Sequence, residues 1–132
     1  MNDFRNDPLA REFWLGCDAG ELMIQRCEAE DCGRAQFYPG LLCRRCGSLE
    51  LAWERASGYG TLYAVTRVDR PPIDDEGGGH CLALVQLDEG PRLLSHIVGG
   101  VGVIPPIATR LKVEFSTLPG QSGLFPVFAI TP

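Results

Sequence analysis

Two closely spaced pairs of cysteines constrain this chain more than any other feature of its sequence. Cys27 and Cys32 form the pattern C-x4-C-G, and Cys43 and Cys46 form the pattern C-x2-C-G. Two to four intervening residues let a tight turn direct both sulfurs at one ion, and the following glycine relieves the backbone where N–H groups approach the sulfur. The spacing predicts a four-cysteine metal site. Two disulfides, or buried free thiols, are the alternative.

Zinc is the metal that we expect at this site, and iron is the alternative. Four cysteines in two such turns also describe a rubredoxin-like electron-transfer site, in which a ferric tetrathiolate absorbs visible light and zinc does not. The sequence offers no redox partner or second cofactor, which favours structural zinc. A ribbon of this kind has too little core to fold unaided, so we expect the metal to supply its stability.

The composition predicts a cytoplasmic protein that binds neither nucleic acid nor a membrane. The 132 residues carry a net charge of -5 at pH 7, and a zinc tetrathiolate would add about two more negative charges. Acidic residues lie among the arginines around the cysteines, so no positive excess is available for a phosphate backbone. No signal-peptide pattern is visible, and no apolar run approaches the roughly 20 residues of a membrane span. In a reducing cytoplasm, bound metal explains the thiols.

Residues 1–20 are predicted to form a helical segment. Asp7 followed by Pro8 is typical of a helix start, and Gly20 is an expected end. Apolar side chains recur at four-residue intervals and form a narrow stripe, with Trp14 beside it. The stripe consists of Leu9, Phe13 and Cys17. We expect the aromatic side chains to pack either on the body of this protein or on a partner.

Residues 21–50 are predicted to form the zinc ribbon. A strand at 21–26 delivers the first cysteine pair, and residues 36–42 link the two pairs. Beyond the ribbon, β-branched and aromatic residues predict further strands. These strands are expected at 51–56, 59–68, 81–87, 92–98, 110–117 and 124–130. The segments 69–79 and 99–109, rich in glycine and proline, are predicted to be loops.

The strand count predicts an OB-fold barrel in residues 51–132. Ser57-Gly58 is a predicted bulge that joins the first two strands into one long bent strand. Four shorter strands follow it, which gives the five strands of an OB-fold, whereas a β-sandwich needs about seven. Pro126 predicts an edge position for the last strand. The predicted fold class is therefore mainly β, with an N-terminal helix, a rubredoxin-like zinc ribbon and a five-stranded OB-fold barrel.

The ionisable residues do not predict catalysis by this chain alone. His96 shares one face of its predicted strand with Leu94, which indicates a packed or edge histidine. His80 and Cys81 are neighbours in an extended chain, so their side chains point to opposite faces and cannot form a nucleophile pair. Cys17 is expected to be a small buried hydrophobe.

Several motifs, taken together, resemble those of one known family. They are Arg11–Gly16, Gly20-x-Leu22, Gln25-Arg26-Cys27, Cys43–Ser48, Ser57–Tyr63 and Leu84–Leu93. Over residues 9–130, their order and spacing resemble the zinc ribbon plus OB-fold acyl-CoA-associated proteins, first catalogued as a domain of unknown function. The chain departs from that pattern at its C-x4-C pair and at Gly77–Cys81.

The resemblance implies a non-catalytic accessory subunit within a hetero-oligomer. Such relatives associate with thiolase-superfamily proteins: thiolases, hydroxymethylglutaryl-CoA synthases, polyketide-type acyltransferases and aldolases that cleave steroid side chains. Others pair with hydratases of the hot-dog fold. The catalytic residues are then expected on the partner, with this chain helping to hold the CoA thioester. A rubredoxin-like electron carrier and a nucleic-acid-binding OB module are the alternative hypotheses.

Two further sets of residues are predicted to make contacts in such a complex. Exposed apolar side chains of the helix and ribbon are expected to anchor the partner. These are Phe4, Trp14, Leu41 and Leu42. Guanidinium groups near the cysteines are expected to hold a CoA phosphate through charge-assisted hydrogen bonds. These belong to Arg34, Arg44 and Arg45.

Overall fold

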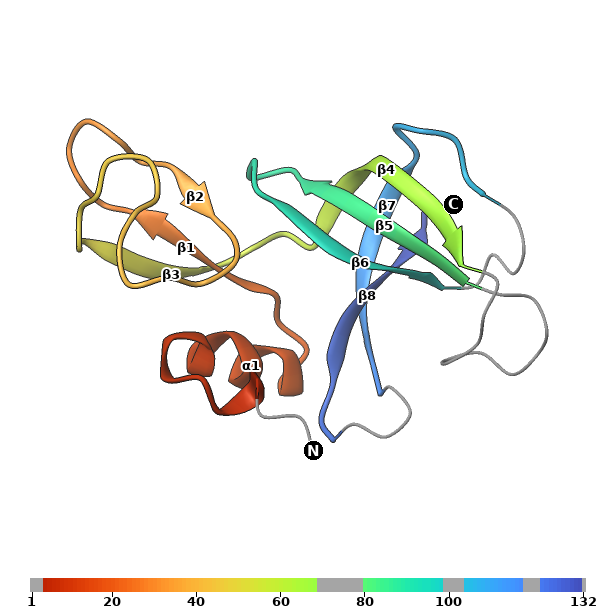
Figure 1. Cartoon of the computed structure of the whole chain (residues 1–132), viewed down its shortest axis with the longest axis horizontal. Coiled ribbons are helices and arrows are strands. Elements are labelled where there is room, and N and C mark those ends of the chain that lie inside the picture. Colours follow the sequence, from red (N-terminus) through yellow and green to blue (C-terminus); the bar gives the residue numbers. More distant parts are fainter. Residues whose placement is uncertain (1–3, 69–79, 99–103, 118–121, 132) are drawn as a thin grey trace.

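The computed structural model describes residues 4–68, 80–98, 104–117 and 122–131. A short helical segment packs against both a three-stranded ribbon and a closed five-stranded barrel (Figure 1). The fold class predicted from the sequence is confirmed. The predicted loop at 69–79 lies outside the described residues. None of the described helices is long and apolar enough to cross a membrane.

The elements follow one another as helices, then ribbon strands, then barrel strands. The helices are η1 (Phe4–Asn6), η2 (Pro8–Ala10) and α1 (Arg11–Asp18). The ribbon strands are β1 (Met23–Cys27), β2 (Ala35–Gln36) and β3 (Leu51–Arg55). The barrel strands are β4 (Tyr59–Val68), β5 (His80–Leu87), β6 (Arg92–Val98), β7 (Arg110–Ser116) and β8 (Phe125–Ile130).

The helical segment begins where the sequence predicts. A carboxylate oxygen of Asp7 accepts a hydrogen bond from the Leu9 backbone N–H at 3.0 Å. The turn that follows is a 3-10 turn, which winds more tightly than an α-helix, so Leu9 leaves the predicted apolar stripe and is exposed. Phe13 and Cys17 of the stripe are buried. Burial raises the pKa of the Cys17 thiol to about 12, as expected of a small buried hydrophobe.

Arg5 fastens the helical segment to the start of the last barrel strand. Its guanidinium donates hydrogen bonds to the Leu124 carbonyl at 3.1 Å and to Asp18 Oδ1 at 2.8 Å. The same Asp18 oxygen accepts from the Leu124 N–H at 3.0 Å. The guanidinium also lies over the rings of Trp14 and Phe125, at 4.6 and 5.3 Å from their centroids. The charged group thus links α1 to β8.

Replacing Asp18 by asparagine is expected to remove an acid-sensitive contribution of about 0.5–1 kcal/mol to stability, the size typical of half-exposed ion pairs. The Leu124 N–H and the Arg5 guanidinium lower the pKa of Asp18. Its contribution is therefore present above the unfolded pKa of about 3.9 and is lost as the pH falls through the lower folded value. The free energy of unfolding in urea should be lower for the variant than for the wild type at pH 7, and the two should be equal near pH 2. Glu12→Gln, on the same helix, is the control; an equal difference at both pH values would contradict the prediction.

Two buried glutamines hold the ribbon together. Strand β1 pairs antiparallel with β2 and β3, and Gln25 lies opposite Gln36. Gln36 Nε2 donates to Gln25 Oε1 at 2.9 Å, and that oxygen also accepts from the Gly40 N–H. Gln36 Oε1 in turn accepts from the Arg44 N–H at 3.0 Å. The predicted link at 36–42 is therefore fixed by amide side chains, which satisfy backbone groups that have no ladder partner.

Strand β3 belongs to the ribbon, and the prediction that it begins the barrel is wrong. It pairs with β1 along its whole length, from Met23 opposite Arg55 to Cys27 opposite Leu51. The chain then turns at Gly58, whose φ of 87° ends the extended run before β4. Strand propensity is similar on both sides of this turn, so the sequence alone does not show which sheet each strand joins. The predicted domain limits at 20/21 and 50/51 stay predictions.

The barrel closes in the order β4-β5-β6-β8-β7. A register shift between Leu62 and Ala64 lets β4 pair with both β5 and β7. Strand β8 lies between β6 and β7, so the predicted edge position is wrong. Pro126 is tolerated because the ladder to β6 starts only at Phe128, and the missing N–H breaks none of its bonds.

One apolar core connects the three parts of the molecule. Phe13 of α1, Ile24 of β1 and Phe128 of β8 are almost completely buried within it. Successive residues of β6 alternate, with Leu93 in the core and Leu94 outside. His96 is half-buried on the outer face with Leu94, as the strand alternation predicts.

Candidate metal centre and adjoining cavities

The four predicted cysteines converge on one point. All their Sγ atoms lie within 4.8 Å of one another, with Cys27 and Cys46 at 3.6 Å and Cys32 and Cys43 at 3.7 Å. Two sulfurs bound at about 2.3 Å to one tetrahedral zinc ion lie about 3.8 Å apart. The residues therefore fit a four-coordinate metal. The disulfide alternative is wrong, since all of these cysteines are free thiols.

Backbone N–H groups prepare the second turn for a metal. The Arg45 N–H donates to Cys43 Sγ at 3.4 Å. The N–H groups of Cys46 and Arg45 lower the pKa of Cys43 to about 6, which favours the thiolate that a metal requires. Gly33 and Gly47 follow the two turns with φ of 71° and 80°, a conformation that glycine adopts without strain.

Four sulfur ligands are the donor set that is typical of structural zinc sites. They leave no open coordination position for a substrate, unlike catalytic zinc sites. A bound zinc ion would cross-link the turn after β1 to the turn before β3. Iron suits the same donors, and the visible absorption of its ferric form distinguishes the two metals.

The three predicted arginines line one cavity. It has a volume of about 280 Å³ and lies where the second cysteine turn faces Pro91 of the β5–β6 hairpin. Arg34, Arg44 and Arg45 are all exposed. In the part of the chain that the structure describes, none of them pairs with a carboxylate, whereas Arg5, Arg26, Arg55 and Arg110 each do. Their charges are therefore available to an anion.

The predicted partner anchors have different surroundings. Leu41 and Leu42 are 65% and 43% exposed on the ribbon, as predicted. Trp14 is only 9% exposed, and the expectation of an exposed anchor is wrong for it. Its indole packs edge-on against Phe13 and Phe125, so the protein's own barrel covers it. The side chain of Phe4 lies outside the described residues.

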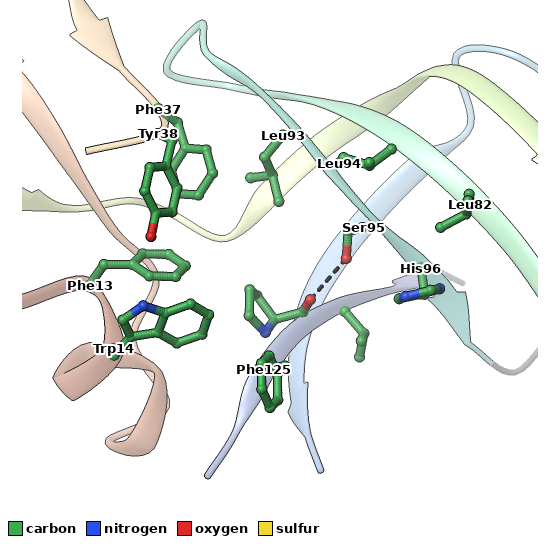
Figure 2. Close-up of a pocket in the computed structure, with 12 residues that line it drawn as sticks. Phe13, Trp14, Phe37, Tyr38, Leu82, Leu93, Leu94, Ser95, His96 and Phe125 are labelled. Carbon is green, nitrogen blue, oxygen red and sulfur yellow. Dashed lines mark hydrogen bonds between the residues drawn. The ribbon is translucent and has the colours of Figure 1, made fainter. Parts of the chain in front are cut away.

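A second cavity, which the sequence did not predict, lies between α1, the ribbon and the barrel (Figure 2). It has a volume of about 290 Å³. Phe13 and Trp14 of α1 and Phe37 and Tyr38 of the ribbon face strands β6 and β8 across it. Its walls come from five separate stretches of sequence. Two pairs of adjacent aromatic residues, at 13–14 and at 37–38, are the local signs of this cavity in the sequence.

Two family profiles match the chain one after the other. Residues 14–52 match "ChsH2, rubredoxin-like zinc ribbon domain", and residues 53–115 match "ChsH2, C-terminal OB-fold domain". The chain belongs to the ChsH2/DUF35 family. This membership confirms the resemblance seen in the sequence motifs. The boundary between the two profiles falls inside β3, after residue 52, whereas in the fold the whole of this strand pairs with β1 of the ribbon.

Solved structures share this ChsH2/DUF35 fold over nearly the whole chain. One described as "Ltp2-ChsH2(DUF35) aldolase" is 27% identical, with a TM-score of 0.79 over 94% of this chain and 95% of that chain. A DUF35 protein of unknown function from Sulfolobus solfataricus is 16% identical, with a TM-score of 0.64 over 94% of this chain and 86% of that chain; at this identity it supports the fold alone.

A curated relative of this ChsH2/DUF35 chain is larger. It is a "Probable enoyl-CoA hydratase alpha subunit" of Thermomonospora curvata, 35% identical over 88 residues. The match covers 66% of this chain and 27% of the relative. The chain therefore spans about a quarter of that protein's length.

Proposed function

We propose that this ChsH2/DUF35 protein is a non-catalytic accessory subunit of an acyl-CoA enzyme of the thiolase superfamily, such as an aldolase, in lipid or steroid metabolism. The likeness to a chain of the Ltp2-ChsH2(DUF35) aldolase carries the proposal, because it extends over 94% of this chain and 95% of that one. The shorter match to an enoyl-CoA hydratase subunit supports the same class of partner and makes a hydratase the second candidate.

The chemistry of the described residues supports a role beside a catalytic subunit. Four of the thiols belong to the metal centre, and the other two, Cys17 and Cys81, are buried. The metal centre has no open position for a reacting group. In the proposed complex the partner supplies the nucleophile and the acid–base groups, and this chain supplies a rigid surface.

The ribbon provides the surface that we propose for the partner. Leu41 and Leu42 project from the link between the cysteine pairs, whose backbone is held by Gln25 and Gln36. Two exposed leucines on a fixed loop suit an apolar pocket on another protein. Because the loop is already ordered, docking would cost little conformational entropy.

Changing Leu41 and Leu42 together to aspartate is expected to weaken the complex at least tenfold, because burying two carboxylates in an apolar interface is costly. The chain would be co-expressed with each thiolase-like, aldolase or hydratase candidate encoded beside it, and assayed by size exclusion and activity. Ile107→Asp, at a residue 59% exposed on the barrel, is the matched control. A chain that stays monomeric beside every candidate would overturn the accessory role.

We also propose that the arginine-lined cavity holds a phosphate of CoA. Guanidinium groups match phosphate oxygens in a bidentate geometry. The cavity gathers three such groups in a chain of net charge -5, and among the described residues none of the three pairs with a carboxylate. Their position beside the metal centre places them on backbone that the metal would stiffen.

A further inference from the structure

The aromatic cavity exists because β6 and β8 diverge. The two strands pair only at Ile97 with Phe128 and at Val98 with Ala129. Toward their starts they separate, and the Ser95 hydroxyl bridges them by donating to the Pro126 carbonyl at 2.8 Å. The helix and the ribbon cover this gap only in part, and a cavity of about 290 Å³ is left between them.

The walls of this cavity are mostly carbon and are preformed. Phe13 contacts Phe37 edge-to-face with ring centroids 5.1 Å apart, and Trp14 contacts Phe125 in the same way at 5.4 Å. The Ser95 hydroxyl is already engaged by Pro126. On the barrel side, Leu82 and the 68% exposed Leu94 form the outer rim. Such a cavity suits an apolar chain or ring and offers little to a polar ligand.

The aromatic cavity adjoins the arginine-lined cavity. Phe37 lines both of them, and Pro91 of the arginine-lined cavity lies two residues before Leu93 of the aromatic cavity. A cationic, anion-binding surface site and an apolar cavity therefore lie next to each other along the junction of ribbon and barrel. This juxtaposition suits one ligand that has a phosphorylated head and an apolar tail.

We infer that the aromatic cavity binds the acyl part of the thioester whose phosphate the arginines hold. The inference rests on the proposed binding of CoA and adds that this chain itself selects for an apolar acyl group. At about 30 Å³ for a methylene-sized group, the volume accommodates on the order of eight to ten carbon atoms. With the acyl chain inside the cavity, its thioester end would lie at the rim beside Leu94 and Tyr38, where a partner can reach it.

Calorimetric titration of the whole chain with CoA, acetyl-CoA and octanoyl-CoA tests this inference. Complete burial adds about fourfold in affinity per methylene, so the six extra methylenes of octanoyl-CoA should improve binding at least thirtyfold even if partly buried. Arg44→Glu should weaken all three ligands by a similar factor. The chain-length gain is the ratio of the affinity for octanoyl-CoA to that for acetyl-CoA. Changing Leu82 and Leu94 together to glutamine should lower this ratio at least tenfold and leave the affinity for CoA unchanged.

Leu15 and Leu49, changed together to glutamine, are the matched control, because both are exposed leucines that do not line the cavity. Thermal unfolding shows that each variant is folded. Equal binding of acetyl-CoA and octanoyl-CoA, or a chain-length gain that survives in the Leu82/Leu94 variant, overturns the inference. So does binding of lysophosphatidate without binding of octanoyl-CoA, which would indicate a phospholipid instead. Partner binding, measured separately by co-expression, decides the accessory role.

Discussion

Replacing Cys43 by serine is expected to remove the metal and the solubility of the protein together. The variant retains three sulfur ligands, and a serine hydroxyl does not replace a thiolate. Structural zinc contributes about 10–16 kcal/mol to the folding of small ribbons, as much as the whole stability of a typical domain. Loss of the ion should therefore expose the ribbon's buried residues. Metal analysis and sedimentation of the expressed variant measure both effects.

The ribbon has little else to keep it folded without the metal. Strand β2 has only two residues, and the long link between the cysteine pairs relies on Gln25 and Gln36. Removing the ion from the wild-type protein with a strong chelator should have the same effect as the substitution. The barrel's core, around Leu62 and Val85, does not include the cysteine ligands and should lose less structure.

Cys17→Ala is the control for the metal prediction. It removes a buried thiol that lies outside the cluster, so the protein should keep one ion per chain. A Cys43→Ser protein that retains both its metal and its solubility would exclude the four-cysteine site. The colour of the wild-type protein identifies the metal, because a ferric tetrathiolate absorbs visible light and zinc does not.

Features that depend on short-range chemistry could be predicted from the sequence. The spacing of the cysteines predicted which thiols meet, and the structure places all four within 4.8 Å. The helix start at Asp7 and Pro8 depends on one cap hydrogen bond and on the fixed φ of proline. Alternation along β6 predicted that Leu94 and His96 share the outer face. Each of these follows from residues no more than 19 positions apart.

Features that depend on pairing between distant residues could not be predicted. The β-forming residues at 51–55 pair with β1, and nothing within that stretch indicates the ribbon rather than the barrel. Trp14 was expected to be an exposed partner anchor. Its indole is buried by Phe125, which lies 111 positions along the chain, and the sequence near Trp14 does not indicate this contact. The aromatic cavity also joins residues from α1, the ribbon and three barrel strands. Only the folded chain brings them together.

Phe13 is the residue at which these distant parts meet, and replacing it by alanine is expected to cost about 3–5 kcal/mol of stability. Its ring is 1% exposed and touches Trp14 of α1 as well as Phe37 and Tyr38 of the ribbon. The truncation would leave a hole that these rings cannot fill without leaving their edge-to-face contacts. Since the free energy of unfolding of a typical domain is about 5–15 kcal/mol, this loss is a large fraction of the total stability.

Urea unfolding followed by tryptophan fluorescence measures the effect of Phe13→Ala. Leu15→Ala is the matched control, because Leu15 lies on the same helix but is 52% exposed, and its loss should change stability by no more than about 0.5 kcal/mol. A loss below about 1 kcal/mol for Phe13→Ala would mean that the helix does not bind ribbon and barrel into one core. The aromatic cavity would then lack the rigid wall that its proposed ligand requires.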